Sequence, residues 1–292
     1  MKILAIGDFQ GRLSFKLKAK LRKENFDMII GLGDYAGIKE WNDWLRTAFI
    51  SFSKGEKFIS AEEFYGKKKF KALIRRDDMA GRGILKSILR FKKPFVYIWG
   101  NGDDRFYDYP FYDKFKGTKI NKGFVKNLNK RQGIYNITYG RIKANNKWFV
   151  GFGGFMDVRA NYRNKEKKHL EQLDIRVKRS KRKFEEIIKP ILKDKKSDRV
   201  FVFHYPPKGV FDMIRTKGNP FKGNSAGVDF FSSAIRKHKP CLVLCGHMHE
   251  YQGAKMFGKS LVVNPGDAER DKYAIIDLPE GKNEKIKVRF AR

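Results

Sequence analysis

The sequence predicts an α/β fold with largely parallel sheets, and two observations carry that prediction. Short apolar runs recur along the chain, and a polar or ionisable residue follows each run at once. The stretches between the runs carry helical periodicity. Strands buried on both faces read as near-continuous apolar runs, and parallel strands need long crossovers, usually helices. The runs are KILAIGD, FDMIIGLGD, KPFVYIWGNGD, NKWFVGFGGF, RVFVFHYPP, CLVLCGHMHE and SLVVNPGD.

Helical connectors are predicted between the early strands. They cover Phe15–Glu24, Glu40–Phe49 and about Ala61–Phe91, the last with a break near the glycines of AGRG. From Arg163 to Arg199, apolar residues recur at helical spacing beneath a basic face. This spacing predicts an amphipathic helix that is interrupted near Pro190.

Residues 104–147 differ from the rest of the chain. They are rich in Phe, Tyr, Lys, Asn and Gly, lack strong helical periodicity, and end in hairpin strands around YNITYGRIKANNKWFVGF. We expect this region to form a cap or rim beside the site. No stretch has the composition of an interdomain linker, so residues 1–292 are predicted to form a single domain.

Charge and composition narrow the class of protein. Lys and Arg number 65 and Asp and Glu 32, which gives a net charge of +33. A positive surface attracts nucleotides, nucleic acid and anionic membranes, although a lysine-rich surface adapted to high temperature would have the same composition. The early apolar run Ile3–Ile6 is too short for a signal peptide, and nowhere do eighteen apolar residues run together. We expect a cytoplasmic protein with no transmembrane segment; the sequence does not indicate its oligomeric state.

The two cysteines lie four residues apart in one predicted strand. That spacing separates Cys241 and Cys245 by ~13 Å, which is beyond disulfide reach. They are predicted to be reduced core residues. The alternative, Cys245 as a zinc ligand near His247, has no CxxC pairing to support it.

Seven oxygen or nitrogen donors end five of the predicted strands. In parallel sheets such residues converge at the carboxyl edge, where ligands bind. Histidines there could simply cap a loop, but burying all seven donors together would be costly without cations. A binuclear metal site explains all of them. The donors are Asp8, Gln10, Asp34, Asn101, His204, His247 and His249.

In order, these residues give DFQ, GD, GNGD, H and GHMH, which resembles the calcineurin-like metallophosphoesterase family. The family order is D-x-H, G-D, G-N-H-D/E, H and G-H-x-H. The resemblance spans nearly the whole chain and implies a four-layer α/β/β/α sandwich of two mixed sheets. It also implies two divalent metal ions, Mn above all, with Mg, Fe, Ni and Zn as alternatives, and a bridging hydroxide that attacks phosphorus.

The resemblance assigns each donor to a metal, with Asp34 shared by both ions. The first metal would be bound by Asp8, Gln10, Asp34 and His249, and the second by Asp34, Asn101, His204 and His247. Asp34, Asn101 and His204 would be the catalytic residues, and Asn101 would also contact the substrate.

Two positions depart from the family pattern. Gln10 stands where the family has its first histidine, and an amide oxygen there favours Mn or Mg and weakens that metal position. Gly102 replaces the histidine that in relatives helps to protonate the leaving group. Arg105 or Lys208 could contact phosphate instead, or be an ordinary surface charge.

The sequence therefore predicts a metal-dependent phosphohydrolase. A phosphodiester or a nucleotide phosphoanhydride is the expected substrate, because leaving groups of low pKa need no proton donor. The alternative is a catalytically weakened scaffold or nucleic-acid-binding protein on the same fold, which Gln10, Gly102 and the charge favour. Asp103 could orient the site or merely form a turn, and Glu250 could be a supporting hydrogen-bond acceptor or merely a loop charge.

Overall fold

The computed structural model describes residues 1–103, 122–156, 158, 167–281 and 284–291. Its strands form two six-stranded sheets. The first has the order β12 (Lys287–Phe290), β11 (Ala274–Asp277), β1 (Lys2–Ile6), β2 (Met28–Gly31), β3 (Phe95–Tyr97) and β4 (Ile134–Asn136). The second has the order β5 (Tyr139–Ala144), β6 (Lys147–Phe152), β7 (Asp198–Phe203), β8 (Leu242–Leu244), β10 (Ser260–Asn264) and β9 (Gly253–Phe257).

Both sheets are mixed, with a parallel centre. Strands β1 to β4 pair in parallel, and β11 and β12 add to β1 antiparallel. In the second sheet β6, β7, β8 and β10 are parallel, and β5 and β9 are antiparallel edge strands. The predicted α/β class with two mixed sheets is confirmed.

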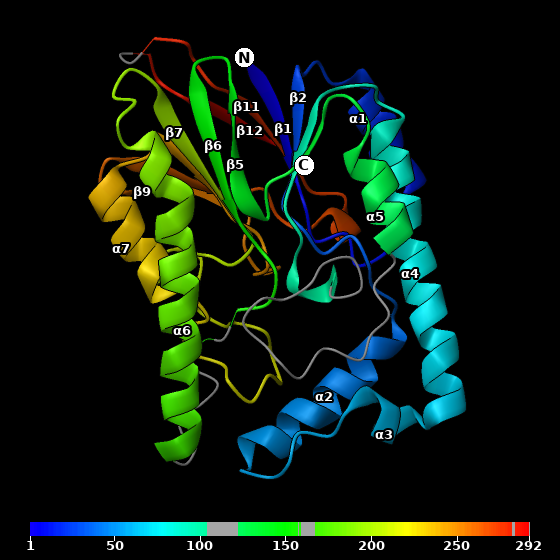
Figure 1. Ribbon diagram of the computed structural model, residues 1–292. Helices are drawn as coiled ribbons and strands as arrows, with labels where there is room; N and C mark the ends of the chain where they lie inside the picture. The colour runs from blue at the N-terminus through cyan, green and yellow to red at the C-terminus, as the bar shows by residue number, and fades with distance from the viewer. Residues whose placement is uncertain (104–121, 157, 159–166, 282–283, 292) are drawn as a thin grey trace.

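Helices cover the outer face of each sheet (Figure 1). On the first sheet lie α1 (Phe15–Lys23), α4 (Lys67–Leu89) and α5 (Lys122–Asn129); on the second lie α6 (Lys167–Ile188) and α7 (Asp229–His238). The alternation of side chains along β1 explains the layers. Leu4 and Ile6 pack beneath the helices, whereas Ile3 and Ala5 join the core between the sheets. The result is the α/β/β/α sandwich that the sequence resemblance implied.

The α2–α4 region corrects one prediction. The structure has α2 (Glu40–Ser53), α3 (Ala61–Tyr65) and α4, and the break falls at Gly66, whose φ is 76°. The break predicted near AGRG is wrong, because α4 continues through it. A glycine inside a helix costs about 1 kcal/mol, and burial of Ile84 and Leu85 outweighs that cost here.

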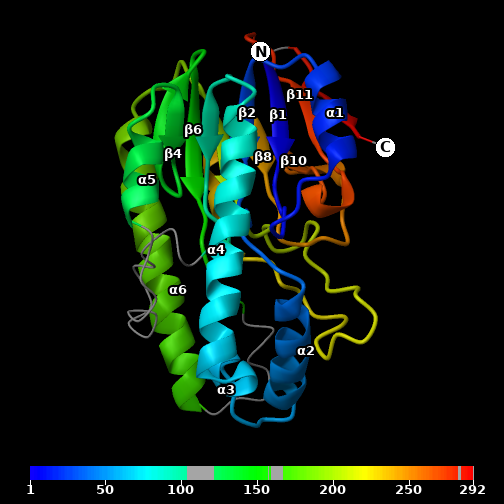
Figure 2. The ribbon, with the colours of Figure 1, turned by 90° about the vertical axis from the view of Figure 1, so that its right-hand side faces the viewer.

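Helices α2 and α3 project past the carboxyl ends of the strands, together with the first half of α4 (Figure 2). Aromatic side chains hold this projection together: Trp41 packs against Trp44 and Tyr65, and Trp44 packs against Phe58. Among the described helices, none is long and apolar enough to span a bilayer.

The region predicted to be a cap or rim, residues 104–147, lies partly outside the described residues. From Lys122 onward the structure shows α5 and the strands β4 and β5, each of which is an edge strand of its sheet. Helix α6 ends at Ile188, and a 3₁₀ turn over Lys189–Ile191 carries Pro190, where the interruption was predicted.

Candidate metal centre

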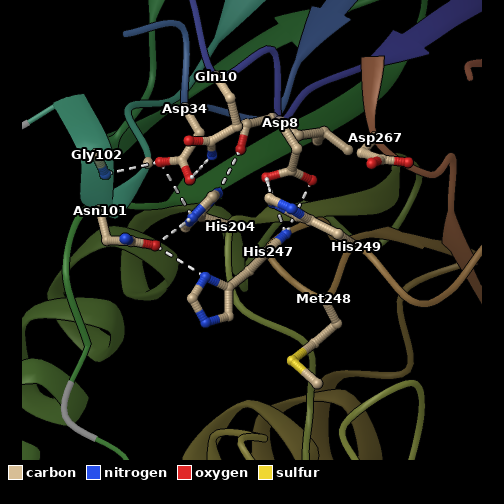
Figure 3. A network of polar contacts seen from close by, with 12 residues as sticks. Asp8, Gln10, Asp34, Asn101, Gly102, His204, His247, Met248, His249 and Asp267 are labelled. Carbon is tan, nitrogen blue, oxygen red and sulfur yellow. Dashed lines mark hydrogen bonds and ion pairs between the residues drawn. The ribbon is translucent and has the colours of Figure 1, made fainter. Parts of the chain in front are cut away.

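The candidate ligands lie where the strands end, and the backbone there has an unusual conformation. Asp8, Gln10, Asp34 and His247 all have positive φ, at 55°, 47°, 53° and 68°. Residues other than glycine seldom adopt this conformation, which persists only where surrounding structure holds it. These residues follow β1, β2 and β8, and the turns there direct their side chains toward one another (Figure 3).

Glycines beside these turns let the carboxylates approach. A Cβ atom on Gly100 would stand 2.2 Å from Asp34 Oδ1, and one on Gly246 would stand 2.6 Å from Asp8 Oδ2. Both distances are too short for real contacts. The glycines of GNGD and GHMH therefore provide space for the two buried carboxylates.

One half of the site gathers around Asn101. Its Oδ1 lies 2.8 Å from His204 Nε2 and 2.8 Å from His247 Nδ1. His204 Nδ1 lies 2.8 Å from the carbonyl oxygen of Leu32, which can only accept, so in the neutral ring Nδ1 carries the proton and Nε2 presents a lone pair. That lone pair faces Asn101 Oδ1 and lies 3.5 Å from Asp34 Oδ1. Acceptors that converge on one another in this way form a site for a cation.

The other half gathers around Asp8, which is 1 % exposed. Both its carboxylate oxygens accept the backbone N–H of His247, at 3.1 and 3.0 Å, and His249 Nε2 lies 3.7 Å from Oδ1. Gln10 donates from Nε2 to Asp34 Oδ2 at 3.0 Å. Its amide would have to turn over to present oxygen to a metal.

Asp34 lies between the two halves. The buried ligand atoms of Asp8, Asp34 and His204 all lie within 4.8 Å of one another, close enough to hold a metal ion. The two histidines of GHMH face different halves, His247 toward Asn101 and His249 toward Asp8. Carboxylate, amide and imidazole donors suit the divalent first-row metals, and the oxygen donors suit Mg and Mn.

Asp103 supports the site in a way that the sequence left open. It is fully buried, and it accepts the backbone N–H groups of Tyr35 at 2.8 Å, Ala36 at 3.0 Å and Gly100 at 2.8 Å. Burial and the charge of Asp34 raise the pKa of Asp103. The side chain thus joins the segment that carries Asp34 to the segment that carries Asn101.

The loop after β10 also contacts the site. Asn264 donates to Met248 O at 3.4 Å and accepts from Gly266 N at 2.9 Å. These two bonds join the GHMH segment to the loop after β10. Asp267, fully buried, lies near Asp8 and His249 in Figure 3 and forms ion pairs with Lys272 at 3.0 Å and Arg270 at 3.3 Å. Asp267 was not among the residues selected from the sequence; its position three residues after the end of β10, in NPGD, was the available signal.

The remaining candidates from the sequence are two cations, predicted to contact phosphate, and a cysteine. Lys208 Nζ is 2.9 Å from Asp229 Oδ1 in an exposed ion pair, and Arg105 lies outside the described residues. Cys245 is a free, buried thiol near Val263 O, and burial raises its pKa. Tyr205, which sequence reasoning missed, stacks on His247 with ring centroids 3.8 Å apart.

Protonation of His249 makes metal binding depend on pH. Burial opposes its protonation, but the hydrogen bond and charge of Asp8, with the charge of Asp34, raise the pKa of His249 to about 9. The pKa of His247 is lowered by burial and by the neighbouring histidines, so His247 is already neutral. A metal that binds His249 must displace one proton. We therefore expect Mn²⁺ affinity to rise about tenfold per pH unit between about pH 6 and pH 8.

Calorimetric titration of Mn²⁺ at pH 6, 7 and 8 measures this dependence. The variant His249→Gln should bind more weakly and with a flatter pH profile, whereas His238→Gln, on α7, should match the unchanged protein. An equal slope in the protein with and without His249 would contradict the assignment.

Comparison with known proteins gives one family match and several similar solved structures. The model of the family described as "Metallophosphoesterase, calcineurin superfamily" matches residues 1–289. A dimetal phosphatase from Danio rerio is 12% identical and superposes with a TM-score of 0.54, covering 99% of this chain and 95% of its own. The protein TT1561 of Thermus thermophilus is 16% identical, with a TM-score of 0.52 and coverage of 99% and 97%.

Another solved chain, 20% identical, superposes with a TM-score of 0.61 and covers 99% of this chain and 98% of its own. No curated protein sequence matches the chain significantly. At these low identities, the solved structures show similarity of fold alone. The family match extends over residues 1–289. The chain belongs to the calcineurin superfamily of metallophosphoesterases.

Proposed function

We propose that this protein hydrolyses phosphodiester or nucleotide phosphoanhydride bonds with two divalent metal ions, Mn²⁺ above all. The observation that carries the proposal is the convergence of carboxylate, amide and imidazole groups at the strand ends. Asp34 Oδ1, Asn101 Oδ1 and the lone pair of His204 Nε2 point toward one another, with Asp8 within ligand reach of Asp34 and His204. Buried acceptors in this arrangement need a positive charge between them.

We assign the residues to the two metal positions that the family resemblance implies. Asp8, His249, Asp34 and a turned-over Gln10 would hold one ion, and Asp34, Asn101, His204 and His247 the other. Bound metals would polarise the phosphoryl oxygens and lower the pKa of the attacking water.

Several residues set the orientation of these donors. The backbone N–H of Gly102 donates to Asp34 Oδ1 at 2.7 Å, which holds the shared carboxylate between the two halves. Leu32 O fixes the tautomer of His204, and Tyr205 fixes the plane of His247. The protein thus orients the donors before metal and substrate arrive.

Gly102 narrows the substrate class. A Cβ atom there would stand 3.2 Å from Asp34 Oδ1, so a side chain at this position would lie beside the reacting phosphate, and none is present. General acid catalysis contributes about 100- to 10,000-fold, and mainly to substrates whose leaving group is a strong base. Anhydrides and aryl esters, whose leaving groups are weak bases, should therefore be favoured over alkyl phosphodiesters.

A substrate panel tests the proposal. We expect Mn²⁺-loaded protein to hydrolyse bis-p-nitrophenyl phosphate and a dinucleotide anhydride, each with kcat/KM at least about 100-fold above that for an alkyl phosphodiester. Including p-nitrophenyl phosphate separates diesterase from monoesterase activity. Failure of every substrate would overturn the proposed reaction.

The net charge of +33 favours a second function, in which the fold serves as a nucleic-acid-binding scaffold. Metal content distinguishes the hydrolase from the scaffold. Elemental analysis of unsupplemented protein should give close to two ions per chain for the hydrolase, and a chain that binds oligonucleotides with a steep salt dependence but retains no metal would favour the scaffold.

A further inference from the structure

The loop between β7 and α7 has a closed, ordered segment, Asp212–Ser225. Ile214 N donates to Asn224 O at 2.9 Å, and Gly223 N donates to Ile214 O at 2.9 Å. At its base the buried carboxylate of Asp212 accepts from Ser225 Oγ and from Gly209 N. The segment, called here the Asp212–Ser225 loop, is therefore held in one shape by its own hydrogen bonds.

This loop is attached directly to the GHMH segment. Glu250, the residue after His249, accepts three hydrogen bonds through Oε1: from Arg215 N at 3.2 Å, Thr216 N at 3.2 Å and Thr216 Oγ1 at 2.7 Å. Tyr251 donates its hydroxyl to Met213 O at 2.9 Å. The acidic Glu250 thus fixes the position of the loop relative to a candidate metal ligand.

The far side of the loop is held by the helix that follows Asp34. The Phe221 ring packs against Phe49 and Phe52 of α2, with centroids 6.1 and 6.3 Å apart. The loop consequently spans the space between two of the segments that carry candidate ligands.

A hollow of about 530 Å³ opens in this loop, lined by Met213, Ile214, Arg215, Lys222 and Gly223. Its lining combines two cations with an apolar surface, and none of the described residues that line it is acidic. The Arg215 guanidinium lies 4.7 Å from the centre of the Tyr251 ring, a cation–π contact that restrains it. Glu250 bonds the loop backbone at Arg215 and leaves the guanidinium available to an anion.

We propose that this hollow binds the leaving group of the substrate, and that the leaving group is a nucleotide with its own phosphate. The inference rests on the proposed hydrolase function and deepens it. Arg215 and Lys222 would bind the departing phosphate through charge-assisted hydrogen bonds, and Met213 and Ile214 would contact the nucleoside. In the reaction the oxygen of water bonds to phosphorus, the bond from that phosphorus to the bridging oxygen breaks, and the bridging oxygen departs as part of the nucleoside monophosphate. The two protons of the water pass to the product phosphates or to solvent.

The test uses the full chain and the variants Arg215→Gln and Lys222→Gln, with Lys217→Gln as the matched control. Lys217 is an exposed cation on the same loop that does not line the hollow. For a dinucleotide anhydride, we expect KM to rise about tenfold in each of the first two variants. For bis-p-nitrophenyl phosphate, whose leaving group has no phosphate, kcat/KM should stay within about twofold, and Lys217→Gln should change neither substrate.

A binding measurement separates the hollow from the metal chemistry. Adenosine monophosphate, titrated calorimetrically into metal-free protein, should bind about tenfold more weakly to Arg215→Gln than to the unchanged chain. Equal affinity of both variants and the unchanged chain, or equal losses on both substrates, would overturn the hollow as a leaving-group site. If the unchanged chain hydrolyses nothing, the proposed reaction fails, and adenosine monophosphate binding alone decides the hollow.

Discussion

Replacing Asp34 with asparagine is expected to lower kcat/KM for bis-p-nitrophenyl phosphate by about 1,000-fold or more. Among the described residues Asp34 is the side chain that faces both halves of the site, so its loss weakens both metal positions together. An ion acting as a Lewis acid contributes several kcal/mol to the transition state, and about 4 kcal/mol corresponds to that factor. Steady-state kinetics at saturating Mn²⁺, with bound metal measured in parallel, checks the result.

The fold of the Asp34→Asn variant should survive. In the metal-free protein Asp34 is buried beside Asp8 and Asp103, and removing one of three neighbouring carboxylates relieves repulsion. We expect its Tm to be no lower than that of the unchanged protein. The matched control is Asp277→Asn, because Asp277 is exposed and lies opposite Lys2 in the register of β1 and β11, at the other end of β1 from Asp8. Activity within about tenfold of the unchanged protein at Asp34→Asn would remove this residue from the centre of the mechanism.

The sequence predicted the sheets because their signal is local. The central strands are apolar on both faces, and all but β6 lead into a polar residue within a few positions, so runs such as LAIGD and VFVFH reveal both the strand and its end. The helix break was misplaced for the opposite reason. Whether Gly66 or the glycines of AGRG interrupt the helix depends on which residues α4 buries against the sheet, and that is a tertiary property.

The same distinction applies to the site. Donors at strand ends could be identified from order and spacing, but the positive φ of Asp8, Asp34 and His247 could not, since none is a glycine. Nor could the sequence show the partner of Lys208, which pairs with Asp229 in the next helix. The sequence is equally compatible with a supporting and a merely charged Glu250, because its three hydrogen bonds come from Arg215 and Thr216, which are distant along the chain.

Asp103 gives the second large effect, on stability. Asp103→Ala would leave three buried backbone N–H groups, of Tyr35, Ala36 and Gly100, without their acceptor. Each unsatisfied group costs about 1 to 3 kcal/mol, and relief of the repulsion between Asp103 and Asp34 offsets part of that cost, so the free energy of unfolding should fall by about 3 to 5 kcal/mol. Domains are stable by only about 5 to 15 kcal/mol in total, so this is a large fraction. Urea denaturation of the metal-free protein measures the change.

The control for Asp103→Ala is an aspartate that accepts a backbone hydrogen bond at the surface. Asp27 accepts the backbone N–H of Lys2 at 2.7 Å at the surface, and Asp27→Ala should cost less than about 1 kcal/mol because water replaces the acceptor. Asp103→Asn keeps one acceptor oxygen, so its loss in the free energy of unfolding should lie between those of Asp103→Ala and Asp27→Ala. A loss below about 1 kcal/mol for Asp103→Ala would show that the two segments hold together without it. The expected larger loss, together with weaker Mn²⁺ binding, would show that Asp103, which is not a predicted metal ligand, holds Asp34 and Asn101 in position relative to each other.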